Sequence, residues 1–421
     1  MAKQRNDRPD VVIVGAGVVG LSTALMAQHR GFRALLLDRK GPAAEASRGN
    51  AGAFAFSEII PLATPGVIRK APRWLFDPLG PLSIPPIYAL RLAPWMFRFW
   101  RAAKPNRVEN GIRAQASLMD HCRKVLPRFL EASATDSLLR QNGNLEVYES
   151  RAEFSAARPY WEARMPFDIP FEPVHGVTAL ADIQPGLDKR FVSGVFTPHY
   201  SSIADPLNYC LAIAAALRDR GGTIETADVR MLSPGPSGAT VHCADGRTVS
   251  ARHVVVCAGA WSHRLAATIG DRIPLETERG YNTTLPAANF DLRTQITFAG
   301  HGFVVSRIGA GVRVGGAVEL GGLERAPNFK RADAMLAKAK TFLPDLDTRN
   351  GTQWMGFRPS LPDSLPVIGR AGASRNILYA FGHGHLGLTQ SAGTADLICH
   401  LLADSASPID LGPFRADRFQ L

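Results

Sequence analysis

VVIVGAGVVG (residues 11–20) follows a short polar lead, and LLLD (residues 35–38) follows it after one amphipathic segment that closes at Gly31. An apolar run, an amphipathic stretch and a second apolar run ending in an acid predict strand, helix and strand. Three glycines in the turn between such a strand and helix are typical of dinucleotide binding. The alternative interpretation is the same tight turn without a ligand.

Each glycine of this turn has a predicted physical role. Gly15 allows the tight turn, Gly17 lets the backbone approach a pyrophosphate, and Gly20 lets the helix lie close to the sheet. The N-terminus of the helix then offers N–H groups and a partial positive charge to the diphosphate. Asp38 is placed where a carboxylate can accept hydrogen bonds from ribose hydroxyls, which disfavours a 2′-phosphate, although Arg39 keeps that question open.

The size and charge of the chain limit the function classes. Its 421 residues favour two domains, and 46% hydrophobic with 20% charged residues is ordinary for a globular protein. The net charge is +11, but no nucleic-acid-reading motif accompanies it, so we expect no nucleic-acid partner. An anionic membrane surface or an anionic substrate explains this charge at least as well.

The cysteines and the N-terminal residues favour a reducing compartment. No C-x-x-C pair occurs, and we expect buried thiols at Cys122, Cys210, Cys243, Cys257 and Cys399. The first ten residues are polar and lack the apolar core of a signal peptide, and no run of about eighteen apolar residues predicts a membrane-spanning helix. We therefore expect a cytoplasmic protein.

The segment 59–104 combines aromatic side chains with seven basic residues and a single acid, Asp77. Aromatic rings beside cations suit a membrane interface, where rings lie at headgroup depth and cations meet anionic lipid. The alternative is that the rings pack against the rest of the protein while the cations reach water. The first interpretation predicts peripheral contact with the inner face of the cytoplasmic membrane. The residues concerned are Arg69, Lys70, Arg73, Trp74, Phe76, Tyr88, Arg91, Trp95, Phe97, Arg98, Phe99, Trp100, Arg101 and Lys104.

Three strands that end in glycine, near residues 15, 259 and 382, predict a nucleotide-binding domain assembled from separate segments. Residues 303–316 alternate more strongly and are broken by glycine, which favours an antiparallel sheet. We expect an α/β nucleotide-binding domain formed by residues 1–85, 193–272 and 352–421. A second, mainly antiparallel-sheet α+β domain is expected for residues 86–192 and 273–351.

Four blocks together carry a resemblance to a known family. The blocks occur in the same order as in the FAD-dependent D-amino acid dehydrogenases of the glycine and D-amino acid oxidase (DAO) group. Nearly the whole sequence resembles this family. This resemblance implies a discontinuous Rossmann-like FAD-binding domain with a substrate domain above it, and FAD held non-covalently. The blocks are Gly15–Gly20 with Asp38, Ala46-Ser47-Arg48-Gly49-Asn50-Ala51-Gly52, Val254–Trp261, and Gly356–Gly369 with Gly382-His383-Gly384-His385-Leu386-Gly387.

Further segments are similar to one branch of that family. They are Ile60–Ala63, Asp77–Leu82, Glu278–Tyr281 and the loop 382–387. The branch acts on cis-4-hydroxy-D-proline, so the resemblance implies a cyclic D-amino acid such as this one or D-proline as the substrate.

The resemblance also implies residue roles. Arg358 would hold the substrate carboxylate above the flavin, since a guanidinium matches a carboxylate with two parallel hydrogen bonds. Tyr281 would add a hydroxyl, and His385 would line the substrate site. The alternatives are a surface turn for Arg358, burial in a sheet for Tyr281 and structural histidines. The implied cofactor-binding residues are Gly15, Gly17, Val18, Val19, Gly20, Asp38, Arg39, Ser47, Asn50, Ala51, Gly52, Val229, Ala258, Gly259, Trp261, Gly356, Gly382, His383, Gly384, Leu386, Gly387, Leu388 and Thr389.

Oxidation of an amine beside a carboxylate is the implied chemistry, with a hydride passing from Cα to flavin N5 and electrons passing on to a membrane quinone or another acceptor. Two alternatives stay open, an oxygen-using oxidase of glycine or sarcosine and a flavin-carrying subunit of a larger complex. Arg279 and Arg307 are reserve cations with expected structural roles. No metal is expected, since the histidines of the Gly-His-Gly-His sequence lack a third ligand nearby.

Overall fold

The computed structural model describes residues 8–69, 80, 82–286 and 290–419. The opening stretch forms β1 (Val11–Val14), α1 (Val18–His29) and β2 (Ala34–Asp38), as the pattern predicts. A six-stranded sheet continues from them in the order β10-β2-β1-β14-β21-β20. Its other strands are β10 (Thr223–Thr226), β14 (His253–Val256), β20 (Val367–Ala371) and β21 (Ser374–Phe381).

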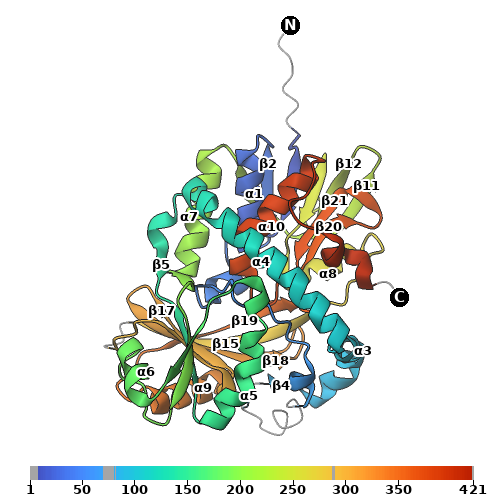
Figure 1. Cartoon of the computed structure of the whole chain (residues 1–421). Helices are drawn as coiled ribbons and strands as arrows, with labels where there is room; N and C mark the ends of the chain where they lie inside the picture. Colours follow the sequence, from blue (N-terminus) through green and yellow to red (C-terminus); the bar gives the residue numbers. More distant parts are fainter. Residues whose placement is uncertain (1–7, 70–79, 81, 287–289, 420–421) are drawn as a thin grey trace.

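The strands β1, β14 and β21 run parallel and side by side, so three distant segments of the chain meet in this sheet. In Figure 1 this sheet and its helices form the upper half of the molecule. Only β20 is antiparallel to its neighbour. The carboxyl ends of parallel strands lie at one edge of a sheet, which is where α/β proteins bind ligands.

Alternation along β1 fixes the two faces of the sheet. Val11 and Ile13 pack into a core with helices, whereas Val12 and Val14 pack into a second core with a small antiparallel sheet. The Asp205 side chain caps the helix Pro206–Asp219 by accepting the backbone N–H groups of Leu207 and Asn208. The first core involves α1, α4 (Pro105–Ser133), α7 (Pro206–Asp219) and α10 (Gly387–Leu402), and the second involves β11 (Val229–Gly235), β12 (Gly238–Cys243), β13 (Thr248–Ala251) and α8 (Ser262–Ala267).

A nine-stranded sheet fills the lower half of Figure 1. Most of its strand pairs are antiparallel, as the alternation over residues 303–316 predicts, whereas β6 with β16 and β4 with β18 are parallel. Its path is β19 (Thr352–Ser360), β15 (Glu276–Leu285), β18 (Gly311–Leu320), β17 (Phe303–Ile308), β16 (Gln295–Phe298), β6 (Asn144–Tyr148), β8 (Ser193–Thr197) and β7 (Glu172–His175), with β4 (Leu82–Ser83) beside β18.

The remaining elements connect or cover these sheets. A small sheet joins β3 (Ala53–Phe54), β9 (Ser201–Ile203) and β5 (Leu139–Gln141). The other α-helices are α3 (Pro86–Ala102), α5 (Arg151–Glu162), α6 (Val177–Ile183) and α9 (Lys330–Phe342). The short 3-10 helices are η1 (Ala46–Gly49), η2 (Asp136–Leu138), η3 (Met165–Phe167), η4 (Gly259–Trp261), η5 (Ala299–His301), η6 (Gly412–Phe414) and η7 (Ala416–Phe419).

The boundaries between the sheets differ from the predicted ones. The strands β4, β8 and β19 belong to the nine-stranded sheet, although boundaries at residues 85, 193 and 352 assign them to the nucleotide-binding domain. The strand β19 pairs along its whole length with β15. Strand pairing of this kind depends on distant partners, so local sequence patterns place such boundaries poorly.

All five cysteines are buried and unpaired, as expected. No helix within the described ranges is long and apolar enough to cross a bilayer. Several residues of the basic aromatic segment lie outside the described residues, namely Lys70, Arg73, Trp74, Phe76 and Asp77, and so does the Asp77–Leu82 motif apart from Gly80 and Leu82.

Candidate active site

A cavity of about 840 Å³ lies between the carboxyl edge of the six-stranded sheet and the nine-stranded sheet. This volume is within the usual range for a ligand site, roughly 300–1,000 Å³. Every predicted site residue lines this cavity except Gly20, Gly52 and Gly382. The three separate segments of the chain therefore converge on one site.

The glycine turn has the conformation that the sequence predicts. Gly15 has a φ of +109°, and a Cβ there would come within 2.4 Å of the Cys257 carbonyl oxygen. A Cβ at Gly20 would lie 1.8 Å from the Gly15 carbonyl oxygen, so no side chain fits between helix and turn. Gly20 thus acts through packing, which explains why it does not line the cavity.

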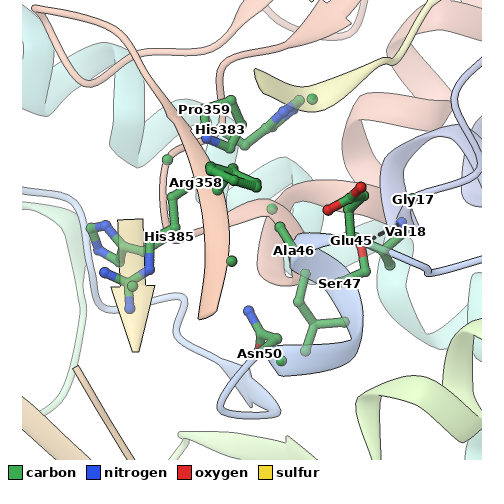
Figure 2. A pocket seen from close by; sticks show the side chains of 18 of the residues that line it. Gly17, Val18, Glu45, Ala46, Ser47, Asn50, Arg358, Pro359, His383 and His385 are labelled. Carbon is green, nitrogen blue, oxygen red and sulfur yellow. Dashed lines mark hydrogen bonds between the residues drawn. The ribbon is translucent and has the colours of Figure 1, made fainter. Parts of the chain in front are cut away.

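The N-terminus of α1 opens into this cavity. Gly17 is the N-cap residue and has no side chain to satisfy the first N–H groups of the helix. The Val18 N–H donates to Ser47 Oγ over 2.9 Å, and both groups line the cavity (Figure 2). N–H groups at the positive end of a helix dipole fit a pyrophosphate, so this end of the cavity suits a dinucleotide.

The Asp38 carboxylate is already engaged with the backbone around it. Its Oδ2 accepts the Ala16 N–H over 2.8 Å, while its Oδ1 accepts the N–H groups of Lys40 and Gly41 over 2.7 and 2.9 Å. A carboxylate has about four acceptor positions, so one remains for a ribose hydroxyl. Binding of ribose by Asp38 stays a prediction.

Two stacked planar side chains, Arg39 and Trp261, line one end of the cavity. The Arg39 guanidinium lies 3.7 Å above the Trp261 ring and donates to Glu45 over 2.8 Å. Val229, the first residue of β11, lines the cavity together with both of these planar side chains. These residues would hold the adenine end of a dinucleotide. Glu45 is not among the predicted site residues. Its contact with Arg39 is made within a loop, where neither helical nor strand periodicity indicates which residues meet.

The loop that follows η1 is held by the nine-stranded sheet. Arg313 donates to the carbonyl oxygens of Arg48 and Asn50 over 3.2 and 2.5 Å, and Asn282 donates to that of Gly49 over 3.0 Å. Burial lowers the pKa of Arg313 to about 10. The small-residue loop is thus positioned by strands that lie more than two hundred residues away in the sequence.

An unpredicted tryptophan explains two of the glycines near this loop. A Cβ at Gly49 would lie 2.0 Å from the Trp354 ring, and a Cβ at Gly356 would lie 1.9 Å from it. Trp354 itself lines the cavity. Gly356 is therefore required at least in part to make room for this ring.

Arg358 of β19 faces the cavity, as Figure 2 shows. Its Nη1 donates to the Ala317 carbonyl oxygen over 3.0 Å, and within the described part of the chain no carboxylate forms an ion pair with it. Burial lowers the pKa of Arg358, whereas the neighbouring Glu278 raises it. An enclosed guanidinium without an ion-pair partner is a ready site for an anionic ligand.

The position of Arg358 depends on a glycine on the adjacent strand. A Cβ at Gly280 of β15 would lie 2.4 Å from the Cζ and from Nη2 of the Arg358 guanidinium. Gly280 lies within the segment Glu278–Tyr281, whose sequence predicts no role for this glycine. Only pairing of β15 with β19 places the two residues together.

We expect Gly280→Ala to displace the Arg358 guanidinium while FAD remains bound. A displaced guanidinium would orient the substrate less well. A displacement of about 1 Å is expected to lower kcat/KM roughly 100-fold. Steady-state kinetics and the flavin content of the purified variant measure the two effects. Gly369→Ala is the matched control, because its Cβ would meet only Arg415 Cα at 3.9 Å. Unchanged kinetics in Gly280→Ala would contradict the assigned role of Arg358.

The two histidines of the loop after β21 differ. His383 is buried, its Nε2 lies 3.0 Å from Thr394 Oγ1, and burial lowers its pKa to about 3. His385 is exposed and lines the cavity, and desolvation by the protein around it lowers its pKa. Arg358 lowers this pKa further, while Glu278 and Glu58 raise it. Both imidazoles are neutral at neutral pH.

The Tyr281 hydroxyl is engaged by partners within the protein, although the residue lines part of the cavity. It donates to Glu319 through a short hydrogen bond and accepts the Asn328 N–H over 3.1 Å. The ring packs in the hydrophobic core of the nine-stranded sheet. We therefore assign Tyr281 to the sheet and not to the substrate carboxylate, which is the alternative that the sequence analysis left open.

Arg279 and Arg307 have the structural roles expected of them. Arg279 pairs with Glu319 over 3.3 Å, and Arg307 donates to the Leu292 carbonyl oxygen over 3.0 Å. Among the described residues, no three His, Cys, Asp or Glu side chains gather as metal ligands would. Two cysteines line the cavity, Cys210 and Cys257, and burial raises the pKa of each to about 12.

Sequence reasoning missed one polar wall of the cavity. It is formed by Glu58, Glu146, Tyr160, Tyr200 and Gln295. Two signals were present: Glu58 is the single charged residue within the segment 51–63, and Glu146 interrupts the apolar strand 145–148. A carboxylate isolated in an apolar run is a candidate for a buried functional group.

Comparisons with known proteins agree with this arrangement. Residues 10–401 match the family model described as "DAO: FAD dependent oxidoreductase". The chain is 34% identical over 419 residues to a protein named D-amino-acid oxidase from Bradyrhizobium diazoefficiens, covering 97% of this chain and 98% of that protein. It is 29% identical over 414 residues to a D-amino acid dehydrogenase from Sinorhizobium medicae, covering 95% and 97%.

Solved structures show the same fold. A glycine oxidase from Geobacillus kaustophilus superposes with a TM-score of 0.78 at 20% identity, covering 98% of this chain and 99% of that one. An L-proline dehydrogenase from P. horikoshii superposes with a TM-score of 0.75 at 16% identity, covering 98% of each chain. The α/β architecture with its second, antiparallel sheet is therefore that of these enzymes.

Proposed function

Since the chain belongs to the DAO family of FAD-dependent oxidoreductases, we propose that it oxidises a D-amino acid to the corresponding imino acid. The observation that carries this proposal is the Arg358 guanidinium, which forms no ion pair with any described residue and lies in the same cavity as the glycine turn. The names of the two relatives described above support a D-amino acid as the substrate.

The residues of the chain position the substrate. Arg358 binds the substrate carboxylate, and Gly280 leaves room for the guanidinium to face it. The neutral His385 on the same cavity can accept a hydrogen bond from the substrate amine at an imidazole nitrogen. FAD, which the glycine turn and the loop after Ser47 would hold, would supply the acceptor for a hydride from the substrate Cα, while the amine would lose a proton as the imine forms.

The resemblance to the hydroxyproline branch supports a cyclic substrate, cis-4-hydroxy-D-proline or D-proline. We propose a quinone as the electron acceptor, because the Sinorhizobium relative is named a dehydrogenase. The alternative is an oxidase that passes electrons to oxygen, which the name of the Bradyrhizobium relative favours.

Anaerobic titration tests the proposed reaction. The purified flavoprotein is mixed with D-alanine, D-proline, cis-4-hydroxy-D-proline and their L-enantiomers while the visible absorbance of the flavin is followed. Bleaching by D-amino acids and not by the L-forms is expected. Peroxide release with air as the only acceptor, compared with reduction of a soluble quinone, then separates oxidase from dehydrogenase. An oxidised spectrum with every D-amino acid would instead favour a flavin-carrying subunit.

We also propose that α3 contacts an anionic membrane surface. Four large apolar side chains on this helix are strongly exposed: Ile87 at 95%, Leu90 at 88%, Phe97 at 55% and Trp100 at 51%. Cations accompany them, with Arg101 near the Phe97 ring and Lys104 near the Trp100 ring. By contrast, Trp95 is buried and stacks on Phe99, so only part of the aromatic segment serves packing. Figure 1 shows α3 at the edge of the molecule.

Vesicle binding tests this surface. We expect the double variant Ile87→Glu, Leu90→Glu to lose binding to vesicles rich in phosphatidylglycerol by roughly 100-fold, from about 1.5 kcal/mol of lost burial for each side chain. Co-sedimentation measures it, and binding of the unmodified protein should weaken with salt. Leu211→Glu on α7 is the control, since Leu211 is 45% exposed on another helix. Equal binding of the double variant and the unmodified protein would exclude α3 as the contact.

A further inference from the structure

One wall of the cavity is rich in hydrogen-bond acceptors and contributes none of the predicted cofactor-binding residues. Glu58, Glu146 and Gln295 belong to this wall, which we call the acceptor wall. We infer, on the basis of the proposed function, that the acceptor wall binds a hydrogen-bond-donating group on the side chain of the substrate, either a hydroxyl or an ammonium. The substrate is then held at both ends, with its carboxylate on Arg358.

The Glu58 carboxylate is held in a fixed orientation. Its Oε2 accepts the Tyr160 hydroxyl over 3.0 Å, and its Oε1 lies 3.6 Å from Arg164 Nη2. Arg164 is fully buried, donates to the carbonyl oxygens of Ser57 and Tyr160 over 2.8 and 2.7 Å, and lies between the rings of Tyr160 and Trp161. Such support pre-organises a carboxylate for recognition of a ligand.

Two further groups lie beside Glu58, and one of them has an acceptor without a partner among the described residues. Glu146 accepts the Tyr148 hydroxyl over 2.5 Å at Oε1, and it is close enough to Glu58 for the two charges to interact. Gln295 is 3% exposed and donates to the Tyr200 hydroxyl over 3.3 Å, but its Oε1 has no hydrogen-bond partner among the described residues. A buried acceptor without a donor indicates that a ligand supplies one.

Charge on the acceptor wall favours a donor over an anion. One cation, Arg164, serves two carboxyl groups, and burial raises the pKa of Glu146 to about 7. Glu58 and His385 line the same cavity, so the acceptor wall belongs to the cavity that holds the predicted substrate site, and Glu58 raises the pKa of His385. A substrate with an apolar side chain would leave these acceptors without partners, and sites of this kind discriminate strongly against such analogues.

Matched substrate pairs test the inference. The first pair is cis-4-hydroxy-D-proline with D-proline, and the second is D-lysine with D-norleucine. Within each pair only one member carries the donor, so the pairs separate a hydroxyl from an ammonium. We expect kcat/KM for anaerobic flavin reduction to favour the donor-bearing member at least tenfold in one pair. Glu58→Gln should reduce this preference roughly tenfold, because a hydrogen bond to a charged acceptor becomes one to a neutral acceptor.

A binding measurement and a control variant complete the experiment. Calorimetric titration of the same four compounds into the chemically reduced protein gives dissociation constants without turnover, and these should show the same preference. Glu162→Gln is the control, because Glu162 lies on the same helix as Tyr160 but pairs with the exposed Arg158 and does not line the cavity.

The outcomes distinguish the two claims. Reduction by all four compounds without preference for a donor in either pair, or an unchanged preference in Glu58→Gln, would overturn the acceptor wall and leave the proposed oxidation standing. Failure of these compounds and of D-alanine to reduce the flavin would overturn the proposed function and, with it, this inference.

Discussion

The variant Arg358→Ala is expected to lose most of its activity while keeping its flavin. Removal of one partner of an enclosed charge pair costs about 2–5 kcal/mol, which corresponds to roughly a 30- to 5,000-fold decrease in kcat/KM. Most of this decrease should appear as a higher KM, because Arg358 binds the carboxylate before and during the reaction. Steady-state kinetics with the best D-amino acid measure the decrease.

Two further variants make this result specific. Arg358→Lys keeps the charge but loses the planar pair of donors, so its kcat/KM should lie between those of the alanine variant and the unmodified protein. Arg307→Ala should behave as the unmodified protein, because its guanidinium serves the Leu292 carbonyl oxygen and does not line the cavity. If Arg358→Ala retained full kcat/KM, the carboxylate would have to bind elsewhere.

The variant Gly17→Asp is expected to be purified without FAD. It places a carboxylate at the N-cap of α1, where the pyrophosphate of the cofactor would lie. Two like charges about 4 Å apart repel by about 4 kcal/mol at an effective dielectric constant near 20, so binding of FAD should weaken roughly 1,000-fold. The ratio of visible to ultraviolet absorbance of the purified protein measures its flavin content.

Gly17→Ala separates charge from bulk in this experiment. Its Cβ would lie 3.3 Å from Ser47 Oγ, which requires only a small shift of that hydroxyl, so this variant should retain most of its FAD. Thermal unfolding of both apoproteins checks that the fold survives. A fully flavinylated Gly17→Asp protein would show that the diphosphate does not lie at this helix.

The conformation of the glycine turn could be predicted because its signals are local. The turn at Gly15 and the close packing of Gly20 each follow from a few neighbouring residues, and the structure shows both of them. Packing also explains the exceptions. Gly382 has a φ of +86°, and a Cβ there would meet the Leu361 side chain at 2.3 Å, so it serves the turn after β21 and does not line the cavity.

The substrate half was less accessible because it depends on strand pairing. The register of β15 against β19 brings Gly280 under Arg358, and the opposite orientation of Tyr281 turns its hydroxyl toward Glu319. In a strand, neighbouring residues face opposite sides, so a one-residue difference decides which face of the sheet a side chain lies on. Glu58 was missed because its partners lie about a hundred residues away, on α5 and at the N-cap of η3.

A crystal structure of the flavoprotein with a non-oxidisable carboxylic acid tests the central claim most directly. We expect FAD to extend from the N-terminus of α1 to Arg358, with both terminal nitrogens of Arg358 within hydrogen-bonding distance of the ligand carboxylate. A ligand carboxylate bound away from Arg358, or a flavin ring outside the cavity that Arg358 and His385 line, would contradict it.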